Sequence, residues 1–193
     1  NGPSPEFEAL TDSRFWAQAL NEFPKLRVSF GHFGGSTPVA AGMARARAFA
    51  GLMDGDPTHP GSRAYADAAY FVEVVSKEPD LQSLLRKLYE ETSAKGDAAL
   101  VNRFMYGTDW EMTLIEGPMK NYLRDFETLL SELEVRPAMR SQGHTDLAAR
   151  FFGLNAARWA GLVAGDATRL RLDRFYSAHR IKADWTAKLD RRS

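Results

Sequence analysis

The chain has 193 residues, 44% of which are apolar, and its 25 lysine and arginine residues balance its 25 aspartate and glutamate residues. Because the net charge is zero, no overall field attracts nucleic acid or an anionic membrane, and we expect neither as a partner. The absence of cysteine excludes disulfides, thiolate nucleophiles and cysteine-ligated metals, and it fits a reducing, cytoplasmic location. No apolar run approaches the roughly 18 residues that span a membrane.

Helix and strand patterns alternate through the first half of the chain. Apolar residues recur at helical spacing in the helical segments, whereas residues 26–30 alternate apolar and polar side chains as a strand does. Asp12, with Thr11, offers the first helix an N-cap, and Pro24 ends that helix. In chain order, the expected elements are a helix over 12–23, a strand over 26–30, a helix over 38–53, a buried strand that begins in 64–75 and runs into a loop or helix, and a helix capped by Asp80 and ended by Gly96.

The second half contains one strand and is otherwise helical. Asn155 is well placed to cap one of the short helices. The expected elements are a short helical stretch, a strand over 103–106, a loop over 107–110, helices over 120–133, 146–152 and 156–162, and a mostly helical segment over 164–193. Large apolar residues expected in the core are Phe15, Trp16, Phe30, Phe104 and Met105.

Strands that alternate with helices of ten or more residues are typical of parallel β-α-β units, so the expected fold class is α/β. The pattern contains about three such units. A closed (β/α)8 barrel typically needs about 250 residues, and this chain is too short to form one.

Two of the predicted strands are followed by residues that can do chemistry. His32 follows strand 26–30, and Asp109 follows strand 103–106. In parallel α/β folds the C-terminal ends of strands are where sites assemble. A histidine and an aspartate there can hold a divalent metal or flank its bound water. The simpler interpretation of the same positions is a hydrogen-bonded packing histidine and a turn aspartate.

Four segments carry a resemblance to a known family. They are FPKLRVSFGHFGG at 23–35, AYAD at 64–67, FMYGTDW at 104–110 and FGLNAARWAGL at 152–162. In their order and approximate spacing, over residues from about 11 to 163, they resemble the amidohydrolase-related (amidohydrolase 2) family of metal-dependent hydrolases and aromatic-acid decarboxylases.

The resemblance implies a fold and a site. The strand before His32 would be the sixth of a TIM-type (β/α)8 barrel, Tyr65 would lie on the seventh, and Asp109 would end the eighth. In that family the matching aspartate is a metal ligand or a proton carrier, and the matching histidine contacts the activated water or the substrate. The implied cofactor is a divalent metal, expected to be zinc, and the implied partner is a small-molecule substrate. Trp110 and Tyr70 follow strands and are expected either to line the substrate pocket or to pack.

Three features depart from the family pattern. The chain has no His-x-His pair, which forms the core of the family's metal site, and no histidine that matches the fifth strand. The remaining histidines fall in loops or late helices: His59, His144 and His179. Glu111 stands beside Trp110, where many members have proline shortly after the aspartate.

These departures lead to the expectation that the chain is a C-terminal fragment. Residues 1–163 would form the last three β/α units of the barrel, and 164–193 a helical extension. Alone, the fragment would bind metal poorly and be inactive, and its open edge would be covered by the N-terminal half of the barrel, by another chain, or by a second copy in a homo-oligomer. The alternative function is a non-catalytic half-barrel that serves as a binding or assembly module.

Overall fold

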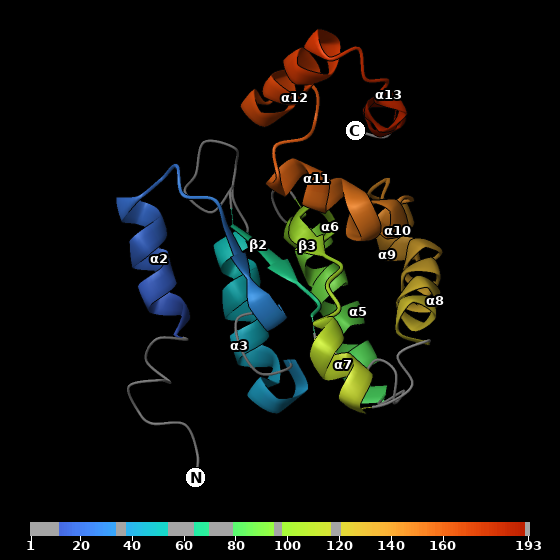
Figure 1. The fold of residues 1–193 in the computed structure, drawn as a ribbon. Helices are drawn as coiled ribbons and strands as arrows, with labels where there is room; N and C mark the ends of the chain where they lie inside the picture. The colour runs from blue at the N-terminus through green and yellow to red at the C-terminus, as the bar shows by residue number, and fades with distance from the viewer. Residues whose placement is uncertain are drawn as a thin grey trace.

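Three short parallel strands form the centre of the fold in a computed structural model, which describes residues 12–33, 38–53, 64–69, 79–94, 98–116 and 121–191. The strands are β1 (Val28–Phe30), β2 (Ala64–Asp67) and β3 (Phe104–Met105), and they lie in the order β1-β2-β3. Their register pairs Val28 with Ala64 and Ala66 with Phe104. All three strands therefore run in the same direction and end at the same edge of the sheet (Figure 1).

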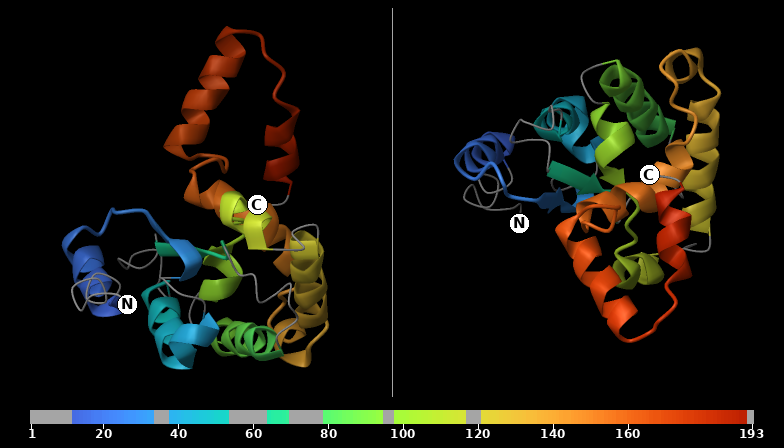
Figure 2. Two further views of the ribbon diagram at one scale, coloured as in Figure 1. Left: turned by 60° about the horizontal axis from the view of Figure 1, so that its bottom comes forward. Right: turned by 90° about the horizontal axis from the view of Figure 1, so that it is seen from above.

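Helices pack against the sheet through apolar stripes. In α3 (Pro38–Met53), the buried residues Ala46, Phe49, Ala50 and Met53 recur at helical spacing. Helix α5 (Pro79–Ser93) contacts α3 and repeats the pattern. Burial of such stripes is the main source of helix stability in a folded domain. The α3 and α5 helices lie side by side along the sheet (Figure 2).

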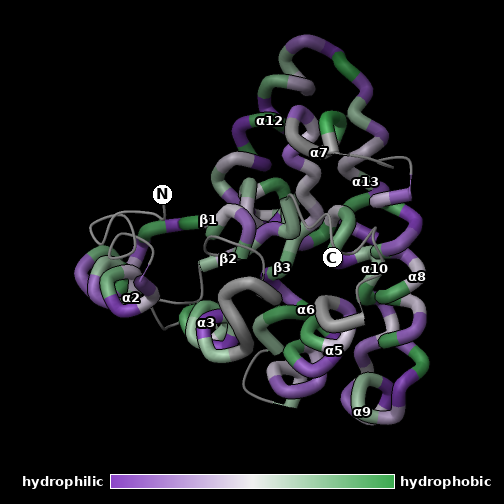
Figure 3. Tube along the Cα trace, turned by 90° about the horizontal axis from the view of Figure 1, so that it is seen from below, coloured by the Kyte–Doolittle hydropathy of each residue, from purple (hydrophilic) through white to green (hydrophobic). Residues whose placement is uncertain are grey.

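The other described elements are helices that lie before, between and after the strands. Helix α6 is hydrophobic along most of its length, whereas α12 is largely hydrophilic (Figure 3). No helix among the described ranges is long and apolar enough to cross a membrane. These elements are α2 (Ser13–Glu22), the 3-10 turn η1 (Gly31–Phe33), α6 (Ala99–Arg103), α7 (Trp110–Glu116), α8 (Tyr122–Glu134), α9 (Pro137–Arg140), α10 (Leu147–Ala149), the π-helical segment η4 (Arg150–Leu154), α11 (Asn155–Trp159), α12 (Ala167–Ala178) and α13 (Asp184–Asp190).

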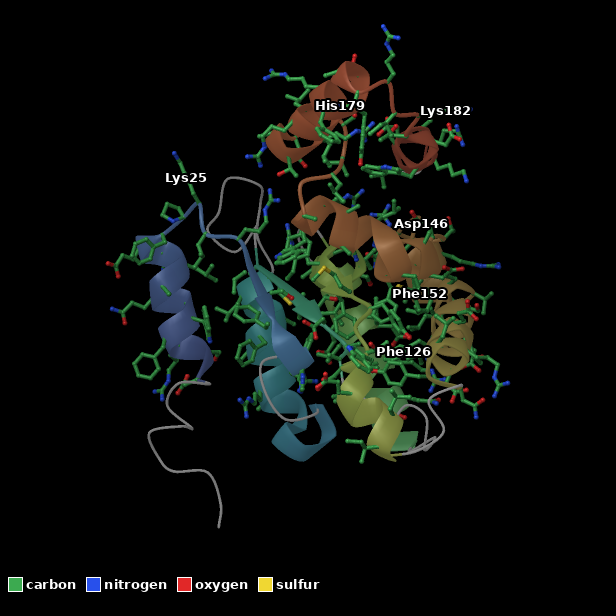
Figure 4. All side chains as sticks on the ribbon, in the orientation of Figure 1. Lys25, Phe126, Asp146, Phe152, His179 and Lys182 are labelled. Atoms are coloured by element: carbon green, nitrogen blue, oxygen red, sulfur yellow. The ribbon has the colours of Figure 1, made fainter. Side chains whose placement is uncertain are left out.

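An aromatic cluster joins β3 to the C-terminal helices. The Phe104 and Phe151 rings lie 5.2 Å apart, and Phe126 lies 5.0 Å from Phe151. Tyr106 contacts Phe152 at 5.1 Å. Phe126 and Phe152 stand among the side chains that fill the space between α8 and β3 (Figure 4). These rings are tilted against one another, and aromatic contacts stabilise a core beyond their buried area, so they fix the position of the chain that leaves β3.

The expected α/β class with a parallel sheet is confirmed, and several boundaries change. The strands are shorter than predicted, because β1 starts at Val28 and Arg103 still belongs to α6. Helix α5 begins at Pro79, so Asp80 lies inside the helix instead of capping it. Helices α7 and α9 occupy segments for which the sequence pattern predicted no helix. The core prediction for Phe15 is wrong: this side chain is 56% exposed, because α2 buries its opposite face through Leu20.

Asn155 has a different role from the predicted one. It lies inside a continuous helical run with φ −66° and ψ −42°, so it is not an N-cap. Its fully buried Nδ2 donates to the carbonyl oxygens of Val101 at 3.0 Å and Phe104 at 2.8 Å. Those carbonyls lie where α6 ends and β3 begins, a place where backbone acceptors lose their helical partners. Asn155 thus holds the start of β3 against α11.

The two last helices, α12 and α13, form an arm that projects from the rest of the fold (Figure 2). Arg169 is buried within it and connects the two helices. Its guanidinium donates to Asp190 through two hydrogen bonds of 2.9 Å and to Asp173 through one of 2.9 Å. It also lies over the Trp185 ring, 5.5 Å from the centroid. A planar guanidinium with two bonds to one carboxylate fixes the relative orientation of the two helices.

Replacing Asn155 with alanine tests its role at the start of β3. The variant loses both hydrogen bonds that the buried Nδ2 donates, so we expect the free energy of unfolding to fall by about 2–3 kcal/mol in urea titrations. Asn21→Ala, on the exposed face of α2, is the matched control and should stay within about 0.5 kcal/mol of the parent chain. Equal effects of the two substitutions would contradict the role.

The Arg169–Asp190 pair makes the stability of the arm depend on pH. The Arg169 guanidinium lowers the pKa of Asp190 below its usual range. Stabilisation by the pair is therefore fully present above the ordinary carboxyl pKa and is lost as pH falls through the lowered folded-state value. We expect Asp190→Asn to lower the melting temperature near about pH 6 and the difference from the parent chain to narrow toward about pH 3. A difference that does not change with pH would contradict the assignment.

Candidate functional site

The C-terminal ends of the three strands place polar groups at one edge of the sheet. β1 leads into η1 with His32, β2 ends in Asp67, and β3 leads through Tyr106 to Asp109. Because the strands are parallel and adjacent, the loops after them meet. This set of loops is called the site edge below. It lies beside α7, on the side of the sheet away from the arm (Figure 1).

His32 and Asp109 come together at the site edge. The Nε2 atom of His32 lies 3.4 Å from Oδ2 of Asp109. The two side chains are 40% and 32% exposed, so both remain accessible to solvent. An ion pair in such a setting adds little to stability. The pair is within reach of one small polar ligand, and its two groups can exchange a proton with that ligand.

Three residues at the site edge adopt left-handed backbone conformations. His32 has φ 51°, Phe33 has φ 53° and Asp109 has φ 45°. Histidine and aspartate tolerate this region better than most residues, whereas phenylalanine does so rarely. Phe33 is held there by burial, since its ring contacts Phe104 edge-on at 5.3 Å. Unfavourable backbone conformations that packing maintains tend to cluster at functional sites.

Asp67 positions the loop that carries His32. Its Oδ1 accepts hydrogen bonds from the backbone N–H of His32 at 3.2 Å and of Ala69 at 3.1 Å, and its Oδ2 accepts from the Ser29 hydroxyl at 3.3 Å. The carboxylate therefore connects the ends of β1 and β2. Asp67 belongs to the AYAD segment of the resemblance, but the sequence analysis assigns it no role, although a single charged residue at the end of the apolar strand 64–67 is a signal for one.

Gly107 lets the loop after β3 approach the loop after β2. A Cβ atom at this position would lie 3.1 Å from the backbone nitrogen of Ala69 and 3.2 Å from its Cβ. Ala68 accepts a hydrogen bond from the Tyr122 hydroxyl and donates its N–H to the Met105 carbonyl at 2.9 Å. Close backbone approach of this kind favours glycine, and here it brings Asp109 toward the first two strands.

Trp110 and Tyr70 are expected either to line a substrate pocket or to pack, and of the two only Trp110 lies among the described residues. Trp110 is the first residue of α7 and is 63% exposed, so it does not pack in the core. Leu114 and Ile115, farther along α7, are 64% and 79% exposed. The side chain of Trp110 is thus available beside Asp109, and its contact with a substrate stays a prediction. Tyr70 lies outside the described residues.

The described residues do not form a complete metal site. No group of three or more histidine, aspartate or glutamate residues converges among them in a way that could hold an ion. Catalytic zinc normally has three protein ligands and one open position, and the site edge offers His32 and Asp109. His179 lies on the arm, where its ring contacts Phe175 at 4.4 Å, and His59 falls outside the described part of the chain. His144 precedes α10, but Asp146, not His144, occupies the N-cap position of that helix.

Comparisons with protein families, curated proteins and solved structures give no match.

Because His32 is left-handed, glycine should be a more stabilising replacement than alanine at this position, which is the opposite of their order in a helix. Both His32→Gly and His32→Ala remove the imidazole, but glycine adopts φ 51° without steric cost. We expect the glycine variant to be more stable than the alanine variant by about 1 kcal/mol in urea titrations.

The control pair lies on the exposed face of α2. There Gln18→Ala should exceed Gln18→Gly in stability by about 1 kcal/mol, the usual helical order. The same order at both positions would show that His32 is not left-handed.

Proposed function

We propose that the chain is the C-terminal part of a TIM-type (β/α)8-barrel hydrolase of the amidohydrolase-related family, and that Asp109 and His32 form its catalytic pair, with Asp109 as the proton carrier and His32 as the oxyanion donor. The observation that carries the proposal is the 3.4 Å separation of His32 Nε2 and Asp109 Oδ2 at the site edge. The resemblance of 23–35 and 104–110 to the family supports the proposal, because these two positions correspond to catalytic residues of that family. Non-oxidative decarboxylation is the second reaction found in that family and is included in the proposal.

The strand order supports a portion of a barrel. Consecutive strands are neighbours and parallel, with helices between them, as in successive units of a (β/α)8 fold. Among the described residues, β1 and β3 each pair with a single strand. In a completed barrel both would gain a second partner. The exposed apolar surface of α7, which includes Leu114 and Ile115, is a surface that such additional structure would cover.

The chemistry proposed for the pair is general acid–base catalysis. The Asp109 carboxylate accepts a proton from the attacking water and returns it to the leaving group. His32 donates a hydrogen bond from Nε2 to the oxygen on which negative charge develops. Asp67 acts through the backbone N–H of His32 and is a positioning residue. Exposure of both reacting side chains leaves the site open to a small-molecule substrate.

A divalent metal belongs to the proposal only through the family resemblance. Asp109 is the residue proposed as a ligand and zinc is the proposed ion, but a catalytic zinc needs three protein ligands, and the described residues contain no group of three that could hold an ion. The remaining ligands must come from outside them. No step above is therefore assigned to the metal, and the proposal includes inactivity of the isolated chain.

A non-catalytic binding or assembly module is the second candidate. It is favoured by one observation, the exposure of Trp110, Leu114 and Ile115 on α7. In a module these residues would meet a partner protein, and Asp109 would serve only as a turn residue. The two candidates differ in what happens when the charge of Asp109 is removed.

The catalytic proposal is tested by removing the charge of Asp109 and the imidazole of His32. The substitutions are made in the whole polypeptide that the gene encodes, because the isolated chain is proposed to be inactive. Asp109→Asn keeps the size of the side chain and its tolerance of a left-handed conformation. Together with His32→Asn, in which asparagine also tolerates the left-handed conformation, it should lower kcat/KM by about 10²–10⁴ on a panel of small esters, amides and aromatic carboxylates. The free energy of unfolding should stay within about 0.5 kcal/mol.

Asp166→Asn, which removes a carboxylate beside the arm, serves as the control and should leave the rate unchanged. A loss of stability of about 1 kcal/mol with full activity would favour the turn role and the module. No turnover of the panel by the unmodified polypeptide would also count against the hydrolase.

A further inference from the structure

A hollow lies between α13 and the helical run of α10, η4 and α11. Its volume is about 620 Å³. Pockets that bind small organic ligands have volumes of roughly 300–1,000 Å³. The residues that line the hollow belong to α13 of the arm and to the region from α10 to Leu162, and none of them belongs to the site edge. It is therefore separate from the proposed catalytic pair and does not depend on it.

The floor of the pocket is apolar and has room for a ligand. It includes Ala149, Gly153 and Ala157, whose side chains are too small to fill the space. A Cβ atom built on Gly153 would meet no atom within 4 Å. Gly153 belongs to the π-helical segment η4, and single π-helical turns occur frequently at functional sites.

The roof of the pocket is held in place before any ligand arrives. It is formed by Trp185 and Leu189 of α13. Arg169 lies over the Trp185 ring at 5.5 Å and binds Asp190, the residue after Leu189, through two hydrogen bonds of 2.9 Å. A wall fixed in this way reduces the entropy that binding must overcome.

Two cationic side chains give the pocket a positive charge. Lys188 and Arg191 line it, and no aspartate or glutamate does. Within the described ranges, neither cation forms an ion pair, and Asp190 between them is bound to Arg169. Cations beside an apolar surface attract a ligand that has an anionic head group and an apolar body.

We propose that this pocket binds an organic carboxylate with an aliphatic or aromatic body. The carboxylate meets Lys188 and Arg191, and the body lies over Gly153 and Ala157 beneath Trp185. The guanidinium of Arg191 matches a carboxylate with two parallel hydrogen bonds. The ligand connects α13 to α11, so its binding also stabilises the arm.

Dodecanoate and dodecyltrimethylammonium are the probes for this pocket, because they share an alkyl chain and differ in the sign of the head group. In calorimetric titrations of the intact chain we expect dodecanoate to bind at least about tenfold more tightly than the cation. Lys188→Gln combined with Arg191→Gln should weaken dodecanoate binding at least about tenfold. The matched control, Arg174→Gln with Lys182→Gln, removes the same charge from other parts of the arm and should change binding less than about threefold.

Gly153→Leu tests the location of the site. The new side chain fills the pocket, so dodecanoate binding should be lost. Thermal stability should be kept or raised, because a glycine is removed from a helical segment. The proposal is overturned if dodecanoate does not bind the unmodified chain, if the two probes bind equally, or if Gly153→Leu binds dodecanoate as the unmodified chain does.

Discussion

Parallel pairing of β1, β2 and β3 is the constraint on which the rest of the structure depends. In an antiparallel arrangement, the residues after neighbouring strands would leave from opposite edges of the sheet. Here His32, Asp67 and Asp109 all leave from one edge, although they are far apart in the sequence. Asp67 adds a direct connection, since its carboxylate accepts hydrogen bonds from Ser29 on β1 and from the backbone of His32.

The site edge keeps an unfavourable backbone because the core behind it is well packed. Phe33 is buried against Phe104, which in turn contacts Phe151. Asn155 binds the carbonyl of Phe104 from the other side. These ring contacts and the hydrogen bond from Asn155 keep the backbone in left-handed conformations that an isolated loop would not maintain. Packing in the interior and chemistry at the edge are thus parts of one arrangement.

Local patterns in the sequence were enough to predict much of this arrangement. The alanine-rich composition of 38–53 identified α3 with its observed bounds, and alternation over 26–30 identified β1, which is shorter. Positions after strands singled out His32 and Asp109, which the structure brings together. These predictions depend on near neighbours in the chain, where periodicity is informative.

Features that depend on distant contacts were not predictable in the same way. Asparagine favours helix N-caps, and this local preference suggested a cap at Asn155. In the structure its side chain instead binds carbonyls of α6 and β3, more than fifty residues earlier in the chain. Phe15 is apolar and helical, and only the packing direction of α2 leaves it exposed. Arg169 can bind Asp190 only when α12 and α13 lie in the observed relative positions, and the same holds for the pocket beside them. No sequence pattern within either helix determines how the two helices are placed. Asp67 was visible as a charged residue at the end of an apolar strand, and its hydrogen bonds needed the neighbouring loop.

The convergence of His32 and Asp109 can be measured directly because the chain has no cysteine. His32→Cys with Asp109→Cys introduces two thiols at the site edge, and a short bifunctional thiol reagent reports whether they are adjacent. Lys25→Cys with Asp109→Cys is the comparison, since Lys25 precedes β1 at the opposite end of the strand (Figure 4). The account predicts rapid intramolecular cross-linking of the first pair and none of the second. Failure of the first pair to cross-link in the folded chain, or equal cross-linking of both pairs, would contradict it.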